Sequence, residues 1–162
     1  MNPKISTLHN VAYFVGALAS ACEKNLGKGS MSICALAGKK FGAEVMEGCP
    51  ATNDPLQAVA ILQEALRKKG IIWEFAPFAG NRASCSSQED GKNKIRLVFS
   101  TCMVRNALFR YSHEQKQSLC YMAHGVFAGA MEKVLTNCKA TLEIVHAGPN
   151  ACLKELILEE KQ

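Results

Sequence analysis

The spacing of apolar residues changes several times along this chain, and these changes constrain its fold more than any other feature. From residue 11 to residue 70, apolar residues recur three and four positions apart, as on one face of an α-helix. They then cluster and alternate as in β-strands, return to helical spacing, and finally alternate again. The pattern predicts an α+β domain of order ααα-ββ-α-ββ, with about four helices packed on a mostly antiparallel four-stranded sheet.

Capping and breaking residues set the expected boundaries, and we treat residues 1–162 as a single domain. Asp54 is expected to cap the third helix, with Pro55 at its first position and Gln57 completing a capping box. The polar segment Ala79–Asn93 is expected to be an exposed hairpin loop or a lid. The expected helices are Val11–Leu26, Met31–Glu47, Pro55 to Lys68-Lys69-Gly70, and His113–Leu135, and the expected strands are Ile71–Phe78, Ile95–Phe99, Ala140–His146 and Cys152–Leu158.

The first two helices carry distinct apolar and small-residue faces. In the first helix, a stripe of small residues could let another helix pack closely, which favours a homodimer. The apolar face of the second helix is expected to point inward. The residues are Val11, Phe14, Val15, Leu18, Cys22 and Leu26 on the first apolar face, Gly16, Ala17, Ser20 and Ala21 on the small stripe, and Ile33, Leu36, Ala37 and Phe41 on the second helix.

Charge and cysteine content narrow the class of protein. The net charge is +5, but the basic residues are scattered and are not interleaved with aromatic residues, which argues against nucleic-acid binding. No apolar run reaches the roughly 18 residues of a membrane span. A disulfide framework is the alternative for the eight cysteines, but several lie in apolar helical patterns, where Cys behaves as a small hydrophobe. We therefore expect mostly reduced cysteines, a minority of them binding metal, and a cytoplasmic location.

Four residues in the last third form a candidate metal site: Cys120, Glu143, His146 and Cys152. Thiolate, imidazole and carboxylate are the groups that bind zinc in tetrahedral sites. The Gly148-Pro149 turn could fold His146 and Cys152 back onto one ion. Each residue also has a plainer explanation, such as core packing for Cys120 or a solvent-facing strand position for Glu143. Spacing alone therefore makes a weak case.

Aromatic residues suggest a second candidate site. They gather on the two predicted strands before the long helix and in the segment that precedes it. Such a cluster is most often plain core, but it could surround a small hydrophobic ligand, because ligand pockets are mostly apolar with few polar anchors. The residues are Trp73, Phe75 and Phe78 on the first strand, Phe99 on the second, and Phe109 and Tyr111 beyond it.

From Leu8 to Leu158 the chain resembles the 4-vinyl reductase domain family, often called hydrocarbon-binding. The resemblance rests mainly on two segments, CYMAHGVFAG at Cys120–Gly129 and EIVHAGPNAC at Glu143–Cys152. Phe99–Cys102 matches the family's earlier strand, and residues 36–42 and 62–70 match its front half less specifically. The resemblance implies a fold shared with Golgi transport-particle subunits and, distantly, with haem nitric-oxide sensors.

The resemblance also implies a zinc site. In phenol-sensing members, Cys, Glu, Cys and Cys hold the ion, and the matching residues here are Cys120, Glu143, His146 and Cys152. His146 replaces a cysteine, and imidazole is an equally good zinc ligand. His124 could replace Glu143 as the fourth ligand, and Cys102 could stand in for either Glu143 or His124. Such a closed site would be structural.

Three functions follow as hypotheses. The first is a non-enzymatic, zinc-stabilised domain that binds or senses a small hydrophobic or aromatic molecule and acts through a separate output protein or through dimer geometry. The second is a reductase or accessory factor of tetrapyrrole vinyl-group metabolism, although no nucleotide fingerprint or catalytic triad is visible. The third is a dimeric scaffold similar to the transport-particle subunits, whose cavity holds an acyl chain.

Overall fold

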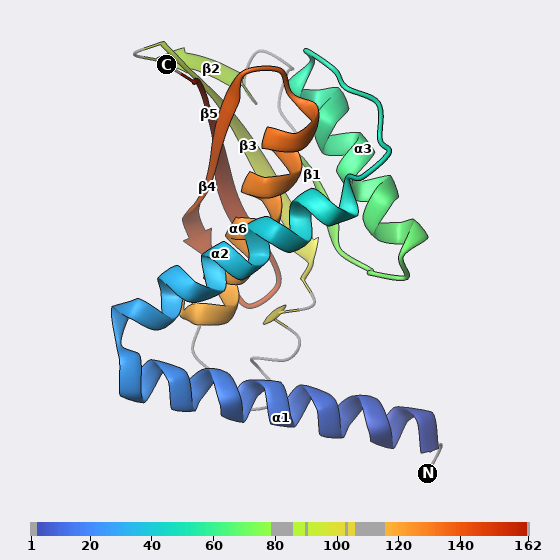
Figure 1. Ribbon diagram of the computed structural model, residues 1–162, viewed down its shortest axis with the longest axis vertical. Helices are drawn as coiled ribbons and strands as arrows, with labels where there is room; N and C mark the ends of the chain where they lie inside the picture. Colours follow the sequence, from blue (N-terminus) through green and yellow to red (C-terminus); the bar gives the residue numbers. More distant parts are fainter. Residues whose placement is uncertain (1–2, 79–85, 90, 103, 106–115, 162) are drawn as a thin grey trace.

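The computed structural model describes residues 3–78, 86–89, 91–102, 104–105 and 116–161. It has four helices and an antiparallel five-stranded sheet in these residues, so the α+β prediction is confirmed (Figure 1). None of the described helices combines the length and the hydropathy needed to cross a membrane. The helices are α1 (Pro3–Leu26), α2 (Lys28–Val45), α3 (Pro55–Lys68) and α6 (Ser118–Val134), and the strands are β1 (Glu74–Pro77), β2 (Ser86–Glu89), β3 (Lys92–Thr101), β4 (Cys138–Ala147) and β5 (Cys152–Glu160).

The sheet is built around β3 and β5. Its order is β1-β3-β5-β4, and β2 pairs with the first residues of β3 on the same edge that β1 occupies further along. Strand β2 lies inside the segment expected to be a loop, so the prediction of four strands was one short. Side chains alternate between buried and more exposed along β4 and β5, as expected for a sheet with one face on the core.

Helix α3 begins as the sequence predicted, but without the capping box. The Asp54 carboxylate accepts a hydrogen bond from the Leu56 N–H at 2.9 Å, and Pro55 is the first helical residue. Gln57 does not reach back to Asp54. Its side-chain oxygen accepts a hydrogen bond from the Thr52 hydroxyl, and that hydroxyl oxygen accepts one from the Asp54 N–H. The Thr52 hydroxyl therefore binds the Asp54 N–H in place of the Gln57 side chain of a capping box.

Helices α2 and α6 pack together through glycines, and α6 lies between α2 and the sheet (Figure 1). A Cβ added to Gly38 would lie 2.0 Å from the Met122 carbonyl oxygen, and one added to Gly125 would lie 2.1 Å from that of Ala35. Only glycine permits backbones to approach this closely. Because glycines form the inward face of α2, the prediction that Ile33 and Leu36 point inward was wrong: they are 57% and 68% exposed. Ala37 is also exposed, and Phe41 packs partly against the core.

Helix α1 crosses one end of the molecule, beyond the sheet (Figure 1). Ala19 is buried, and Glu23 binds the start of α6. Both sequence-predicted faces of this helix are largely exposed. Phe14 and Leu18 of the apolar face are 69% and 55% exposed, and Ala17, Ser20 and Ala21 of the small stripe are exposed as well.

Candidate functional site

Three cysteines and one lysine come together at the junction of α6, β3 and β5. Cys120 lies in the first turn of α6, Cys102 directly follows β3, and Cys152 begins β5 opposite Phe99. Two residues along β5, Lys154 lies on the same inward face as Cys152 and is only 3% exposed. The charges of all three thiols act on Lys154, so the four groups form one cluster. We call this the thiol–lysine cluster.

Burial dominates the protonation of the thiol–lysine cluster. It raises the pKa of the Cys120 thiol, while the Lys116 backbone and the Lys154 charge oppose that rise. It lowers the pKa of Lys154, and the three thiols act in the opposite direction. Both shifts favour the neutral form of each group, as expected where water is excluded.

The sequence-predicted metal set is only partly brought together. Cys120 and Cys152 lie in the thiol–lysine cluster, as does the alternative ligand Cys102. Glu143 and His146 are exposed on β4, where the buried positions are Cys138, Ala140 and Leu142. Neither of the two is among the groups whose charges shift the pKa of Cys120.

His124, the other alternative ligand, lies one turn after Cys120 on α6. Its Nε2 atom is buried without a hydrogen-bond partner, and its ring centroid lies 5.4 Å from that of Tyr121. Burial and, second, the charge of Lys154 lower the pKa of His124 to about 3. The imidazole is therefore neutral at pH 7, and it lies within electrostatic reach of the thiol–lysine cluster.

The donor types suit zinc, but their arrangement does not fit the ion. Among the residues that the structure describes, no group of three or more His, Cys, Asp or Glu side chains is placed to hold a metal. The amine of Lys154 also lies among the thiols, where a metal would have to compete with it. The zinc ion therefore stays a prediction.

The predicted aromatic residues form a packed cluster. Trp73, Phe75 and Phe99 are each at most 3% exposed, and Phe127 of α6 completes the group, with ring centroids 4.7–5.9 Å apart. The Trp73 indole Nε1 is buried and has no hydrogen-bond partner among the described residues. Phe78 is 42% exposed and lies outside the cluster. Phe109 and Tyr111 fall outside the described residues.

Two cationic side chains border this cluster at Phe99. The Nζ atom of Lys154 lies 4.9 Å from the centroid of the Phe99 ring, a cation–π contact. The guanidinium of Arg105 donates hydrogen bonds to the carbonyl oxygens of Phe99, at 3.4 Å, and of Ser100, at 2.5 Å. Sequence reasoning missed Lys154, although it is in phase with the inward residues Cys152, Leu156 and Leu158.

A groove of about 510 Å³ runs between α2, α6 and β4. This is within the usual range of small-molecule sites. Leu36, Tyr121, His124 and Glu143 are among its lining residues. The groove therefore brings two sequence-predicted residues, His124 and Glu143, to one surface. The described residues do not place them together as ligands of one metal ion.

Comparison with known proteins supports the fold. No family model matches the chain, and no curated protein matches it. The structure resembles the phenol-responsive sensory domain of the transcription activator PoxR solved with phenol, with a TM-score of 0.60, 13% identity, and coverage of 91% of this chain and 74% of that one. It also resembles a trafficking protein particle complex subunit 3 from Naegleria fowleri covalently bound to palmitic acid, with a TM-score of 0.55, 17% identity and 98% coverage of both chains.

Proposed function

We propose that this chain is a non-enzymatic domain that binds a small hydrophobic molecule. The observation that carries the proposal is the Trp73 indole N–H, which is buried within the aromatic cluster and finds no acceptor in the part of the chain that the structure describes. An unpaired buried donor costs free energy, and an apolar environment offers a water molecule few partners. A ligand with an apolar body and one oxygen atom would supply the missing acceptor. The rings of Trp73, Phe75, Phe99 and Phe127 pack against one another, so they would have to move apart to admit that body.

The two structural neighbours agree with this class of ligand. One was solved with phenol and the other with covalently bound palmitic acid, so each holds a hydrophobic molecule. At 13% and 17% identity the likeness shows the fold alone. The choice of ligand for this chain therefore rests on its own residues.

The test uses a matched pair of ligands, phenol and toluene, which differ in the hydroxyl group. Trp73 is the only tryptophan, so ligand entry should quench or shift the intrinsic fluorescence. Both ligands should raise the melting temperature, because a ligand bound only by the folded state stabilises it. Phenol should bind more tightly than toluene to the wild type.

Trp73→Phe provides the control, since it keeps an aromatic ring and removes the N–H. We expect this variant to bind phenol and toluene about equally in thermal-shift measurements. If neither these ligands nor a wider apolar panel shifts the wild-type melting temperature, the binding function is rejected.

Zinc is an additional part of this proposal, on donor chemistry alone. A soft, thiol-rich junction between α6, β3 and β5 is where an ion would stabilise the fold. The thiols of Cys102, Cys120 and Cys152 would have to rearrange around it, and Lys154 would have to move away.

A dimeric scaffold is the second candidate, and the exposed apolar surface of α1 and α2 favours it. Tyr13, Phe14 and Leu18 of α1 are 55–69% exposed, and Ile33 and Leu36 of α2 are 57% and 68% exposed. From residue 5 to residue 22 the sequence has no Asp, Glu, Lys or Arg. A helix this poor in charge is normally buried. A second copy of this chain would cover α1 with an equally uncharged helix.

Light scattering tests the dimer. We expect a wild-type mass of two chains, and Phe14→Glu should give a monomer because it would bury a charge in the interface. Lys24→Glu, on the same helix, is the control and should remain dimeric. A monomeric wild type would reject the scaffold and leave the ligand-binding proposal untouched.

A further inference from the structure

The buried ionisable side chains with a full charge in water are all basic among the described residues. Among the residues that the structure describes, the buried charged side chains are Arg105 and Lys154, which are 6% and 3% exposed, and no Asp or Glu is buried. A buried charge is costly unless an opposite charge compensates it. The described interior therefore has two basic side chains and no carboxylate to pair with them.

The described partners of these two side chains are an aromatic ring and two backbone carbonyls. Lys154 faces the ring of Phe99, and Arg105 binds the carbonyl oxygens of Phe99 and Ser100. The acidic groups that act on Lys154 are three thiols, and burial raises the pKa of one of them, Cys120. Rings, carbonyls and thiols lower the cost of burying a cation, but they do not neutralise its charge.

The aromatic cluster adds a third donor without an acceptor. The Trp73 ring lies 5.6 Å from the Phe99 ring, and its N–H is unpartnered. Around Phe99 the described residues therefore supply the amine of Lys154, the guanidinium of Arg105 and the indole N–H of Trp73. An apolar interior so rich in donors is matched to a ligand that carries negatively charged oxygen atoms.

We propose that the hydrophobic ligand carries a carboxylate group, and that Lys154 is the residue that selects it. The aromatic rings hold the apolar body of the ligand, Lys154 pairs with its carboxylate, and Trp73 donates a hydrogen bond. This inference rests on the proposed binding function and narrows it from hydrophobic molecules in general to hydrophobic acids.

The test compares an acid with its alcohol at pH 7.5, where the acid is ionised. The probes are 3-phenylpropanoate and 3-phenylpropan-1-ol, with binding measured by calorimetry. A charge-assisted hydrogen bond in a buried site should make the acid bind about tenfold or more tightly than the alcohol. Equal affinities in the wild type would overturn the inference while leaving the binding function standing. If neither probe binds, the inference and the binding function fail together.

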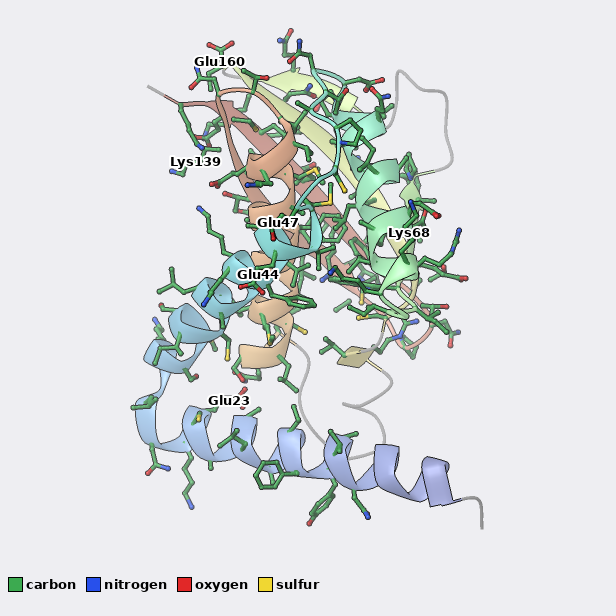
Figure 2. All side chains as sticks on the ribbon, turned by 45° about the vertical axis from the view of Figure 1, so that its right-hand side comes forward. Glu23, Glu44, Glu47, Lys68, Lys139 and Glu160 are labelled. Atoms are coloured by element: carbon green, nitrogen blue, oxygen red, sulfur yellow. The ribbon has the colours of Figure 1, made fainter. Side chains whose placement is uncertain are left out.

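Lys154→Met is the decisive variant. It replaces a buried cation with an apolar side chain of similar length, so we expect it to fold. Its preference for the acid should disappear, whereas Lys139→Met should keep the preference, because Lys139 is an exposed residue of β4 (Figure 2). An acid preference that survives in Lys154→Met would assign the carboxylate to another residue and overturn the proposal.

A second pair keeps the test decisive if Lys154→Met does not fold. Lys154→Arg retains the positive charge and should retain the preference for the acid. Lys154→Gln removes the charge and should lose it. The same affinity ratio in both variants would contradict the inference.

Discussion

The Glu23 carboxylate accepts hydrogen bonds from both the backbone N–H and the hydroxyl of Ser118, the first residue of α6. The N–H contact is 2.9 Å long and joins residues 95 positions apart. Figure 2 shows Glu23 projecting from α1 towards the rest of the molecule. A negative charge at a helix N-terminus is favourable, and Ser118 is fully buried. This contact fixes α1 to the helix that carries Cys120 and His124.

Removing the Glu23 side chain should destabilise the fold. Glu23→Ala leaves the Ser118 hydroxyl and N–H without this acceptor, at a cost of about 1–3 kcal/mol. Glu23→Gln keeps an acceptor oxygen and should cost less. The neighbouring exposed Lys24→Ala should have little effect. Urea denaturation measures all three, and equal midpoints for Glu23→Ala and Lys24→Ala would show that the contact contributes nothing.

Replacing a glycine of α2 with alanine should destabilise the fold at Gly38, which contacts α6, but not at Gly29, which does not. A Cβ on Gly38 would collide with the Met122 carbonyl, so Gly38→Ala should cost about 2 kcal/mol or more. Gly29 is in the same helix, and a Cβ there would meet only the Leu26 Cβ at 3.9 Å. Gly29→Ala should be neutral or stabilise the protein by up to about 1 kcal/mol. Thermal unfolding measures the stability of both variants, and a similar loss of stability in the two would contradict the close packing.

His124 should make the fold sensitive to acid. Its pKa is about 3 in the folded protein and near 6.5 in the unfolded chain, so below pH 6.5 the unfolded state binds the extra proton. Stability should fall as the pH decreases from 6.5 towards 3, by at most about 1.4 kcal/mol per pH unit from this group. His124→Asn should flatten this part of the profile. Lys154→Met should also weaken the slope, since its charge is the second cause of the shift. An unchanged slope in His124→Asn would exclude the imidazole as the source.

If zinc binds, its dependence on mutations should follow the thiols. We expect Cys102→Ser to lower the zinc content as strongly as Cys120→Ser, because both thiols lie in the thiol–lysine cluster. Glu143→Gln and His146→Ala should retain the ion, because both side chains are exposed on β4. Elemental analysis of the purified proteins provides the measurement. Loss of zinc in His146→Ala with retention in Cys102→Ser would favour the set predicted from the sequence, and a zinc-free, heat-stable wild type would reject both.

Sequence periodicity predicted the order of the main elements because each long segment buries one regular face. It failed where packing followed a different rule. In α2 the buried face is made of glycines, which give no hydrophobic signal, so Ile33 and Leu36 were placed on the wrong side. Strand β2 is polar because it pairs along the edge of β3, and its sequence looks like a loop.

The candidate site was predictable in part. The residues of β5 predicted the strand, and its inward alternation includes both Cys152 and Lys154. A lysine in that phase is ordinarily assigned to solvent, since buried lysines are rare. The burial of Lys154 depends on Phe99 and on thiols from two other elements. These residues are distant in the sequence, so no local pattern predicts their contact. The hydrogen bonds between Glu23 and Ser118 also join distant residues, so no local pattern predicts them.

The glycine contact between α2 and α6 has a consequence for how the protein behaves in solution. With the backbones this close, the large side chains of α2 cannot enter the interface, and Ile33 and Leu36 are exposed instead. The exposed apolar side chains of α1 and α2 favour self-association and precipitation. The close contact between α2 and α6 therefore leaves large apolar side chains of α2 on the surface. A preparation in which this surface is left uncovered should lose solubility as its concentration rises, well below the temperature at which the core unfolds.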